Sequence, residues 1–222
     1  MKKIVFAVVA SVAAISAQAS QIFTFGLPIV QSTTEISQSG SLGLFDTNLG
    51  TLTGATLTTF GAATFSFSGT NTAAQAQDAE IISSTSLRWG STLAGINSIL
   101  IPAAHRINLS ATSGDNNYLV GQTLSFGPLS DSGNKIDNVL SVLGLQVAGG
   151  GTFDITCRTV SGLTVVGGGG NISTTQATTA GCGAQIVYDF TQTPPPTVPE
   201  PGSLALIGLA LTGVFVARRR KA

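Results

Sequence analysis

Charged side chains are scarce in this sequence: only 9% of its 222 residues are Asp, Glu, Lys or Arg. Aromatic residues make up 6%, and there are two cysteines, one methionine and one histidine. So few cysteines and histidines do not supply the clusters that structural zinc sites use. The body of the chain instead relies on Thr, Ser, Gly, Ala and Asn for its surface, which suits the cell exterior without being diagnostic.

The formal net charge of zero conceals an uneven distribution of charge. Six of the ten Lys and Arg residues lie at the two ends of the chain. The part between them, 20–197, keeps four cations against nine carboxylates, a formal charge of −5. A mildly acidic surface with few cations argues against nucleic-acid binding.

The first 19 residues have the three parts of a secretory signal peptide. Met1-Lys2-Lys3 is a short basic region, and Ile4 to Ile15 is an apolar run. Ala17-Gln18-Ala19 then supplies the small-x-small pattern that signal peptidases recognise. We expect cleavage after Ala19; a retained membrane span is the weaker reading, because the apolar run is short.

The last 24 residues, 199–222, also read as a targeting segment. Pro199-Glu200-Pro201 precedes an uncharged apolar run that ends at Ala217, and a basic cluster follows. An apolar helix of about 15 residues spans a little over 20 Å, short for a hydrocarbon core of about 30 Å. The cluster predicts a cytoplasmic membrane stop under the positive-inside rule; it consists of Arg218, Arg219, Arg220 and Lys221. The prolines keep the stretch before the helix extended and accessible to an enzyme.

This tail resembles the PEP-CTERM sorting signal of Gram-negative bacteria, because motif, apolar helix and basic end occur in that order. The resemblance implies an exosortase, a membrane-bound cysteine protease, as processing partner, with the inner membrane as an intermediate station. It also implies the cell envelope, cell surface or extracellular matrix as destination and raises exopolysaccharide as a partner. An ordinary single-span tail anchor is the alternative. A GPI signal fits less well, because such signals lack a terminal basic cluster.

The segment between the ends, 20–192, predicts a mainly β fold: one antiparallel, sandwich-like domain, followed by a Pro-rich linker over 193–198. Short apolar and Thr-rich runs alternate with Gly, Asn and Ser turns, as in β-sandwiches. The expected strands are 22–30, 49–60, 64–68, 92–101, 106–111, 118–126, 152–159 and 184–190. Thr72 to Ile82 is the best helical candidate, and 138–148 fits either a strand or a helix.

Cys157 and Cys182 form an even pair in an exported chain, which predicts a disulfide. It would constrain the most glycine-rich stretch and contribute about 3 kcal/mol on the chain-entropy estimate. Two buried free thiols remain the alternative, and nothing nearby supports a metal pair.

A second resemblance rests on Phe45-Asp46-Thr47-Asn48-Leu49-Gly50-Thr51-Leu52, an F-D-x-x-L-G-T-L octet, and on the late segment 185–190. Both are similar to the "choice-of-anchor E" domain, an exported bacterial module. That resemblance implies export and a β fold but no activity. As local structure, Phe45 and Leu49 would flank a turn capped by Asp46 and Asn48.

The body of the chain offers few candidate residues for catalysis, metal binding or ligand binding. His105 would need a nearby nucleophile to support hydrolysis, and no G-x-S-x-G motif occurs. Asp115, Asp131 and Asp137 are possible Ca²⁺ ligands by residue type, but their spacing is neither that of an EF-hand nor that of an RTX nonapeptide, and solvated turns are the alternative. Arg88 and Trp89, with Tyr118, offer a possible sugar site or, more simply, core packing. We therefore expect a non-enzymatic exported protein without metal or cofactor, with a carbohydrate- or Ca²⁺-binding module as the alternative.

Overall fold

The computed structural model describes residues 18–193, and these residues form a mainly β, antiparallel structure. Five long strands make up most of it: β5 (Gly50–Asn71), β6 (Gln77–Ser91), β9 (Thr123–Asn138), β11 (Thr152–Gly167) and β12 (Ile172–Gln192). The shorter strands are β1 (Gln18–Phe25), β2 (Ser32–Thr33), β3 (Ser37–Gly43), β4 (Phe45–Asp46), β7 (Ile107–Thr112), β8 (Asn116–Tyr118) and β10 (Gln146–Val147). One α-helix, α1 (Ala94–Leu100), and three 3-10 turns complete the described part.

Two five-stranded sheets pack face to face as a sandwich. The first has the order β1-β12-β5-β9, with β2 beside β12, and the second has the order β3-β11-β6-β7, with β8 beside β6. Burial alternates along β5 and along both ends of β12, as expected for strands with one face in a core, whereas residues 180–184 of β12 are buried on both faces. Apolar residues from both sheets join in a single cluster between them. A small parallel pair, β4 with β10, lies apart from the two sheets.

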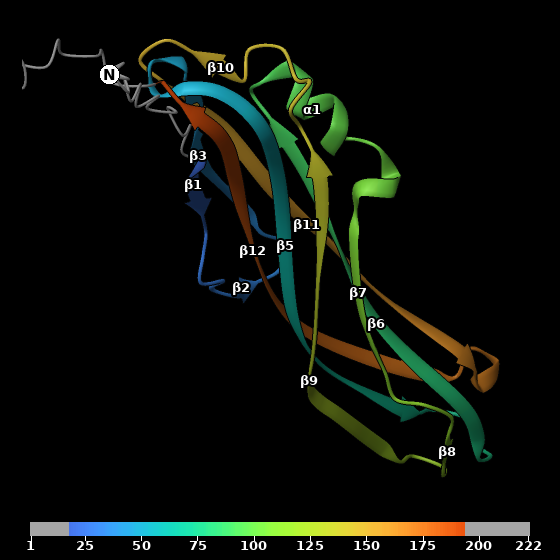
Figure 1. The fold of residues 1–222 in the computed structure, drawn as a ribbon. Coiled ribbons are helices and arrows are strands. Elements are labelled where there is room, and N and C mark those ends of the chain that lie inside the picture. Colours follow the sequence, from blue (N-terminus) through green and yellow to red (C-terminus); the bar gives the residue numbers. More distant parts are fainter. Residues whose placement is uncertain (1–17, 194–222) are drawn as a thin grey trace, which may run out of the picture.

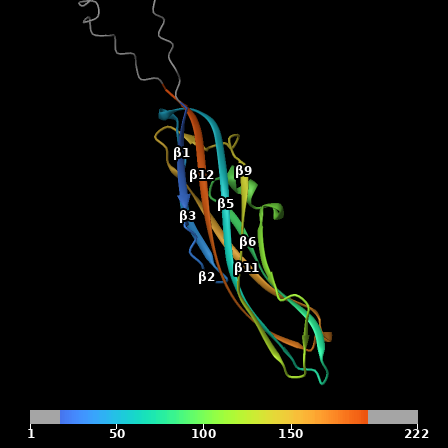
Figure 2. The ribbon, with the colours of Figure 1, turned by 60° about the horizontal axis from the view of Figure 1, so that its bottom comes forward.

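The sandwich is long and narrow, and the two ends of its described chain lie together. Figure 1 shows the long strands running the length of the body, and Figure 2 shows β1, β12 and β5 meeting at one end. There Gln18 at the start of β1 is the register partner of Thr191 near the end of β12. The 3-10 turn η3 (Gly168–Gly170) lies at the opposite end, between β11 and β12. We call these the tail-proximal end and the distal end.

The length of β5 differs from the expectation of two short strands over 49–60 and 64–68. Glycines inside it had suggested turns, but two of them make room for neighbouring side chains. A Cβ at Gly61 would lie 2.6 Å from Leu87 Cδ2, and one at Gly69 would overlap Ile81 Cδ1. These glycines therefore serve packing between the sheets, and the strand continues through them.

Several other local expectations are wrong. The expected strand over 22–30 ends at Phe25, and the one over 118–126 is divided by a turn between β8 and β9. The helical candidate Thr72 to Ile82 is a turn followed by the start of β6. The expected strand over 92–101 is mostly α1, whose inner face buries Ile96 and Leu100. The segment 138–148 is neither a strand nor a helix but a series of turns that leads into β10. Among residues 18–193, no helix is long and apolar enough to cross a membrane.

Candidate functional site

The octet that the sequence singled out forms a corner at the tail-proximal end. Phe45 is fully buried, and Asp46 caps the 3-10 turn η1 (Thr47–Leu49) by accepting from the Asn48 backbone N at 2.9 Å. The same Asp46 Oδ1 accepts from the Gly149 N at 2.8 Å, which joins η1 to the loop after β10. Leu49, expected as an apolar contact, is instead 40% exposed. Asp46 thus provides the cap that the sequence predicted.

The corner also holds the last residues of β12. Gln192 is the register partner of Gly50, and the Thr193 N donates to the Leu49 carbonyl at 3.2 Å. Gly50 has φ +151, and a Cβ there would overlap the Thr191 carbonyl oxygen. Glycine is therefore required at this position by both conformation and space. The octet consequently fixes the strand that leads into the C-terminal tail.

Aromatic side chains fill the core behind this corner. The ring of Phe45 lies 5.8 Å from that of Tyr188 and 5.2 Å from that of Phe190, and Phe23 meets Tyr188 edge-on. The buried Tyr188 hydroxyl donates to the Gly43 carbonyl at 2.8 Å, so its polar atom is satisfied. Burial raises the pKa of Tyr188 well above its ordinary value. The end that carries the tail is thus packed by large rings from β1, from β12 and from the corner.

The targeting residues lie mainly outside the described residues. These are Ala17, the Pro-rich linker from 194 onward, Pro199, Glu200, Pro201, the apolar run and the basic cluster Arg218, Arg219, Arg220 and Lys221. Ala19 is described: it lies in β1 opposite Phe190. Cleavage after Ala19 would leave Ser20 to Phe25 to pair with β12, and the Ser20 hydroxyl donates to Asp189 at 2.6 Å. Ser20 is thus already held at the end of the domain.

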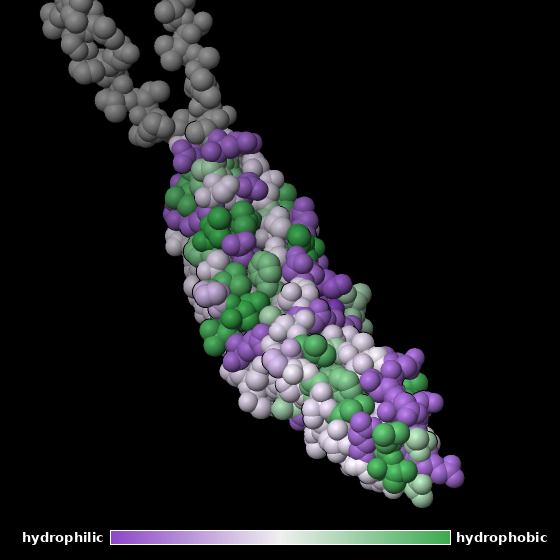
Figure 3. All heavy atoms as spheres, turned by 90° about the horizontal axis from the view of Figure 1, so that it is seen from below, coloured by the Kyte–Doolittle hydropathy of each residue, from purple (hydrophilic) through white to green (hydrophobic). Residues whose placement is uncertain are grey.

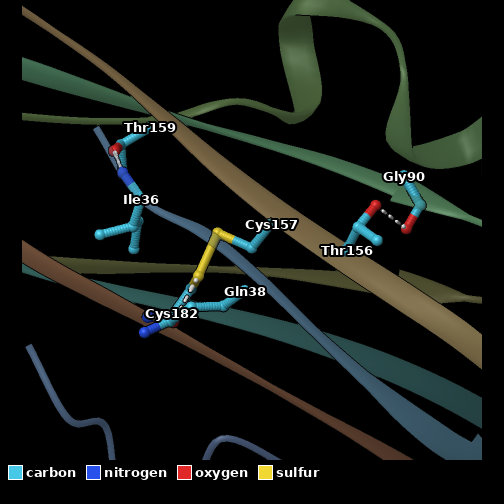
Figure 4. Close-up of a disulfide and its surroundings, with 7 residues drawn as sticks. All are labelled: Ile36, Gln38, Gly90, Thr156, Cys157, Thr159 and Cys182. Carbon is cyan, nitrogen blue, oxygen red and sulfur yellow. Dashed lines mark hydrogen bonds between the residues drawn. A yellow bond between two sulfur atoms is a disulfide. The ribbon is translucent and has the colours of Figure 1, made fainter. Parts of the chain in front are cut away.

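Cys157 and Cys182 form a disulfide, as predicted, and it joins the two sheets. Cys157 lies on β11 in one sheet and Cys182 on β12 in the other, with Cα atoms 6.6 Å apart. Figure 4 shows the bridge crossing between the strands beside Gln38, whose Oε1 accepts from the Cys182 N at 3.1 Å. The bridge lies near the middle of β12 rather than at the glycine-rich turn, which is at the distal end.

His105 lies in a buried polar chain that sequence reasoning missed. Its Nε2 is 3.2 Å from Thr59 Oγ1, and its Nδ1 is 3.1 Å from Asp137 Oδ2. Burial lowers the pKa of His105, Asp137 opposes this effect, and Lys135 adds to it. The order Thr–His–Asp is that of a nucleophile, base and orienting acid, but Thr59 has no exposed surface. The arrangement ties β5 and β9 to the segment before β7.

The aspartates considered as Ca²⁺ ligands are not brought together. Asp131 Oδ2 accepts from the Ser110 N at 3.0 Å, which links β9 to β7, and Asp137 faces His105. Asp115 lies in the turn between β7 and β8. Within residues 18–193, no three His, Cys, Asp or Glu side chains gather as a metal site requires. Each of Asp131 and Asp137 has a protein partner instead.

The aromatic pair considered for a sugar site is separated and buried. Trp89 is 5% exposed near the end of β6, whereas Tyr118 is fully buried opposite Gln77 at its start. Arg88 is exposed on the other face of β6. These residues therefore belong to core packing, except for Arg88, whose surroundings are described below.

One family model matches the chain, and it covers the tail. Residues 197–221 match the PEP-CTERM protein-sorting motif. The motif contains Pro199, Glu200 and Pro201 and begins five residues after β12 ends. No curated protein matches the chain.

Structures of infectious bursal disease virus are among the solved structures that resemble the chain. The Gx strain structure is 12% identical, with 93% of this chain and 52% of the viral chain covered and a TM-score of 0.23. The VP2 subviral particle is 12% identical, with 92% and 51% covered and a TM-score of 0.23. The chain spans about half the length of these viral chains. A likeness at this level assigns neither fold nor function.

The motif match indicates how the chain is exported and sorted. A PEP-CTERM tail indicates an exported protein that an exosortase sorts at the membrane toward the cell envelope or surface. The inter-sheet disulfide agrees with export, because such bonds persist in oxidising compartments.

Proposed function

We propose that this chain is a non-enzymatic cell-surface or extracellular-matrix protein of a Gram-negative bacterium. Its exosortase would process it at Pro199-Glu200-Pro201, after a signal peptide is removed behind Ala19. The observation that carries the proposal is the PEP-CTERM match immediately after β12, the last strand of the sandwich. The apolar run before Arg218 would hold the chain in the inner membrane until processing.

The shape of the domain supports a display role. β12 enters the tail at the same end of the sandwich where β1 starts, so the distal end lies farthest from the point of attachment. Within residues 18–193 the one α-helix has seven residues, so most of the outer surface of the two sheets is available to neighbours. We further propose that the body is a choice-of-anchor E domain, because its octet builds the corner that holds β12.

The role of the motif is tested by changing it in the producing cell. A full-length chain with Pro199→Ala, Glu200→Ala and Pro201→Ala should accumulate in the membrane fraction at the unprocessed mass. Pro194→Ala with Pro195→Ala and Pro196→Ala is the matched control, because it changes three linker residues that precede the matched motif at 197–221. The control should be processed and appear at the surface or in the medium. Normal processing of the motif variant would overturn the proposal.

A further inference from the structure

Three of the four cations in residues 18–193 lie in one row on the outer face of the second sheet. Arg158 on β11 is the register partner of Arg88 on β6. Directly opposite residues of an antiparallel pair project from the same face, and both arginines are exposed. Ile107 pairs with Leu87, so Arg106, one residue earlier and in extended conformation, comes next to Arg88. We call Arg158, Arg88 and Arg106 the arginine row.

The row is not neutralised within the described residues. Within residues 18–193, the one basic side chain found in contact with a carboxylate is His105, which contacts Asp137. On the face of the row, Asp154 lies four residues from Arg158 along β11, about 13 Å away at strand spacing. This separation is between Cα positions, and the Asp154 carboxylate is held toward β3, because the Ser41 hydroxyl donates to its Oδ1 at 2.6 Å. Glu35 accepts from the Ser161 N at 2.7 Å and is thereby held about three residues, or about 10 Å, from Arg158.

This arrangement is unfavourable for the fold alone. Like charges directly opposite each other destabilise a strand pair. The domain carries nine carboxylates and four cations, so it has enough carboxylates to pair with every one of these arginines. A row of unpaired guanidiniums in an acidic domain therefore points to an external anion. Guanidiniums bind carboxylates through paired hydrogen bonds with defined geometry.

We propose that the arginine row binds a linear acidic polysaccharide through its carboxylates. The three guanidiniums come from neighbouring strands about 4.8 Å apart, so they offer a repeated positive charge to a polymer with repeated negative charge. Uncharged hydrogen-bonding groups adjoin the row: Ser37 pairs with Arg158 in register, and Ser86 and Asn108 pair two residues further along. Such groups suit sugar hydroxyls.

Other polyanions fit less well. A formal charge of −5 over the body repels every polyanion, and it does so most strongly for double-stranded DNA, which carries one negative charge per about 1.7 Å of its axis. On the face of the body that Figure 3 draws, hydrophobic side chains form several separate groups rather than one large patch. The inference deepens the proposed surface or matrix role and rests on it. Sorting and polysaccharide binding are nevertheless measured separately, so either can fail alone.

The test uses mature protein purified after expression of the full-length chain, with alginate as the polyuronate probe and dextran as the neutral one. The native protein should bind alginate, more weakly as salt rises, and should not bind dextran. Arg88→Gln, Arg106→Gln and Arg158→Gln should each weaken binding about tenfold, since a hydrogen bond to a charged group is worth at least that factor. The triple variant should not bind.

Lys135→Gln is the matched control, because Lys135 is the remaining cation of the described domain and lies on β9 of the other sheet. It should change alginate affinity less than about twofold, as expected for a charge without a direct contact. Arg88→Gln should also unfold at the same or a higher temperature, since it removes a repulsion. Absence of alginate binding, equal loss in Lys135→Gln, or preferred binding to phosphatidylserine vesicles would each overturn the proposal.

Discussion

The two halves of the sandwich, divided by the disulfide, are built differently. On the tail-proximal side, β1 pairs with residues 184–191 of β12, and β3 pairs with residues 152–158 of β11. On the distal side, the part of the chain that the structure describes supplies neither neighbour apart from the short β2, so β12 and β11 are outer strands there. The aromatic cluster around Tyr188 and the octet corner also lie on the tail-proximal side. The edge strands β1 and β3, the octet corner and the aromatic cluster around Tyr188 thus all lie where the sorting tail is attached.

The difference indicates that the tail-proximal half is the rigid base of the domain. A processing enzyme acts on an extended segment just beyond it, and a firmly closed end keeps that segment separate from the fold. The distal half lacks β1 and β3 beside β12 and β11 and has glycine-rich turns, although β7 and β8 flank β6 there. We therefore expect the outer strands β11 and β12 to open locally at lower free energy in the distal half. The following substitutions test this comparison.

The largest effect is expected at Phe45. Phe45→Ala removes a fully buried ring from the contacts with Tyr188 and Phe190 and should cost about 4 kcal/mol of unfolding free energy. Phe126→Ala is the distal counterpart, because Phe126 is half-buried and stacks on Phe67 at 5.5 Å. Urea unfolding should show a clearly smaller loss for Phe126→Ala. Equal losses would remove the distinction between the halves.

Loss of the disulfide should rank next. Cys157→Ser combined with Cys182→Ser opens a loop of 25-residue separation and should cost about 3 kcal/mol. Reducing agent should lower the urea midpoint of the native protein to about that of the double variant. It should not change the midpoint of the double variant itself. A native protein insensitive to reduction would contradict this assignment of stability.

One glycine in each half provides a further test of the comparison between the tail-proximal and distal halves. Both Gly50 at the corner and Gly170 in the distal turn have positive φ, but only Gly50 has backbone atoms where a Cβ would lie. Gly170→Ala should cost about 1 kcal/mol from conformation alone. Gly50→Ala should cost about 2 kcal/mol more, because the Thr191 carbonyl must move. Equal losses of stability for the two substitutions in thermal unfolding would mean that the backbone of the corner moves at little cost to accommodate the added methyl group.

The smallest effect concerns pH. Burial holds the pKa of His105 below its ordinary value of 6.5, so the folded protein binds fewer protons than the unfolded chain. Stability should therefore fall as pH drops below about 6.5, by less than about 1.4 kcal/mol per unit. Unfolding free energies between pH 7.5 and 5 measure this slope, and His105→Gln should flatten it. An unchanged slope in His105→Gln would assign the pH dependence to other groups.

The sequence predicts some of this architecture and not the rest, for identifiable reasons. Alternation marked the start of β11 and the end of β12, and the paired cysteines predicted their bond. The continuity of β5 was missed, because Gly61 and Gly69 look like turn residues until Leu87 and Ile81 are seen to fill their space. Thr72 to Ile82 was read as a helix because its strand character depends on pairing with β11 and β8.

The candidate sites also differ in whether the sequence alone predicts them. The tail could be predicted because its three parts are contiguous in sequence, and the motif match covers them. The partners of His105 could not, because Thr59 and Asp137 come from strands far apart in the chain. The arginine row likewise appears only once the register of β7, β6 and β11 is known.

Mass spectrometry of the mature protein from the producing cell tests the central claim most directly. The account predicts a chain that starts at Ser20, ends near Pro199 or Glu200 and carries the intact Cys157–Cys182 bond. A chain that retains Met1, or that keeps Arg218 to Ala222 at its end, would contradict export and exosortase sorting respectively.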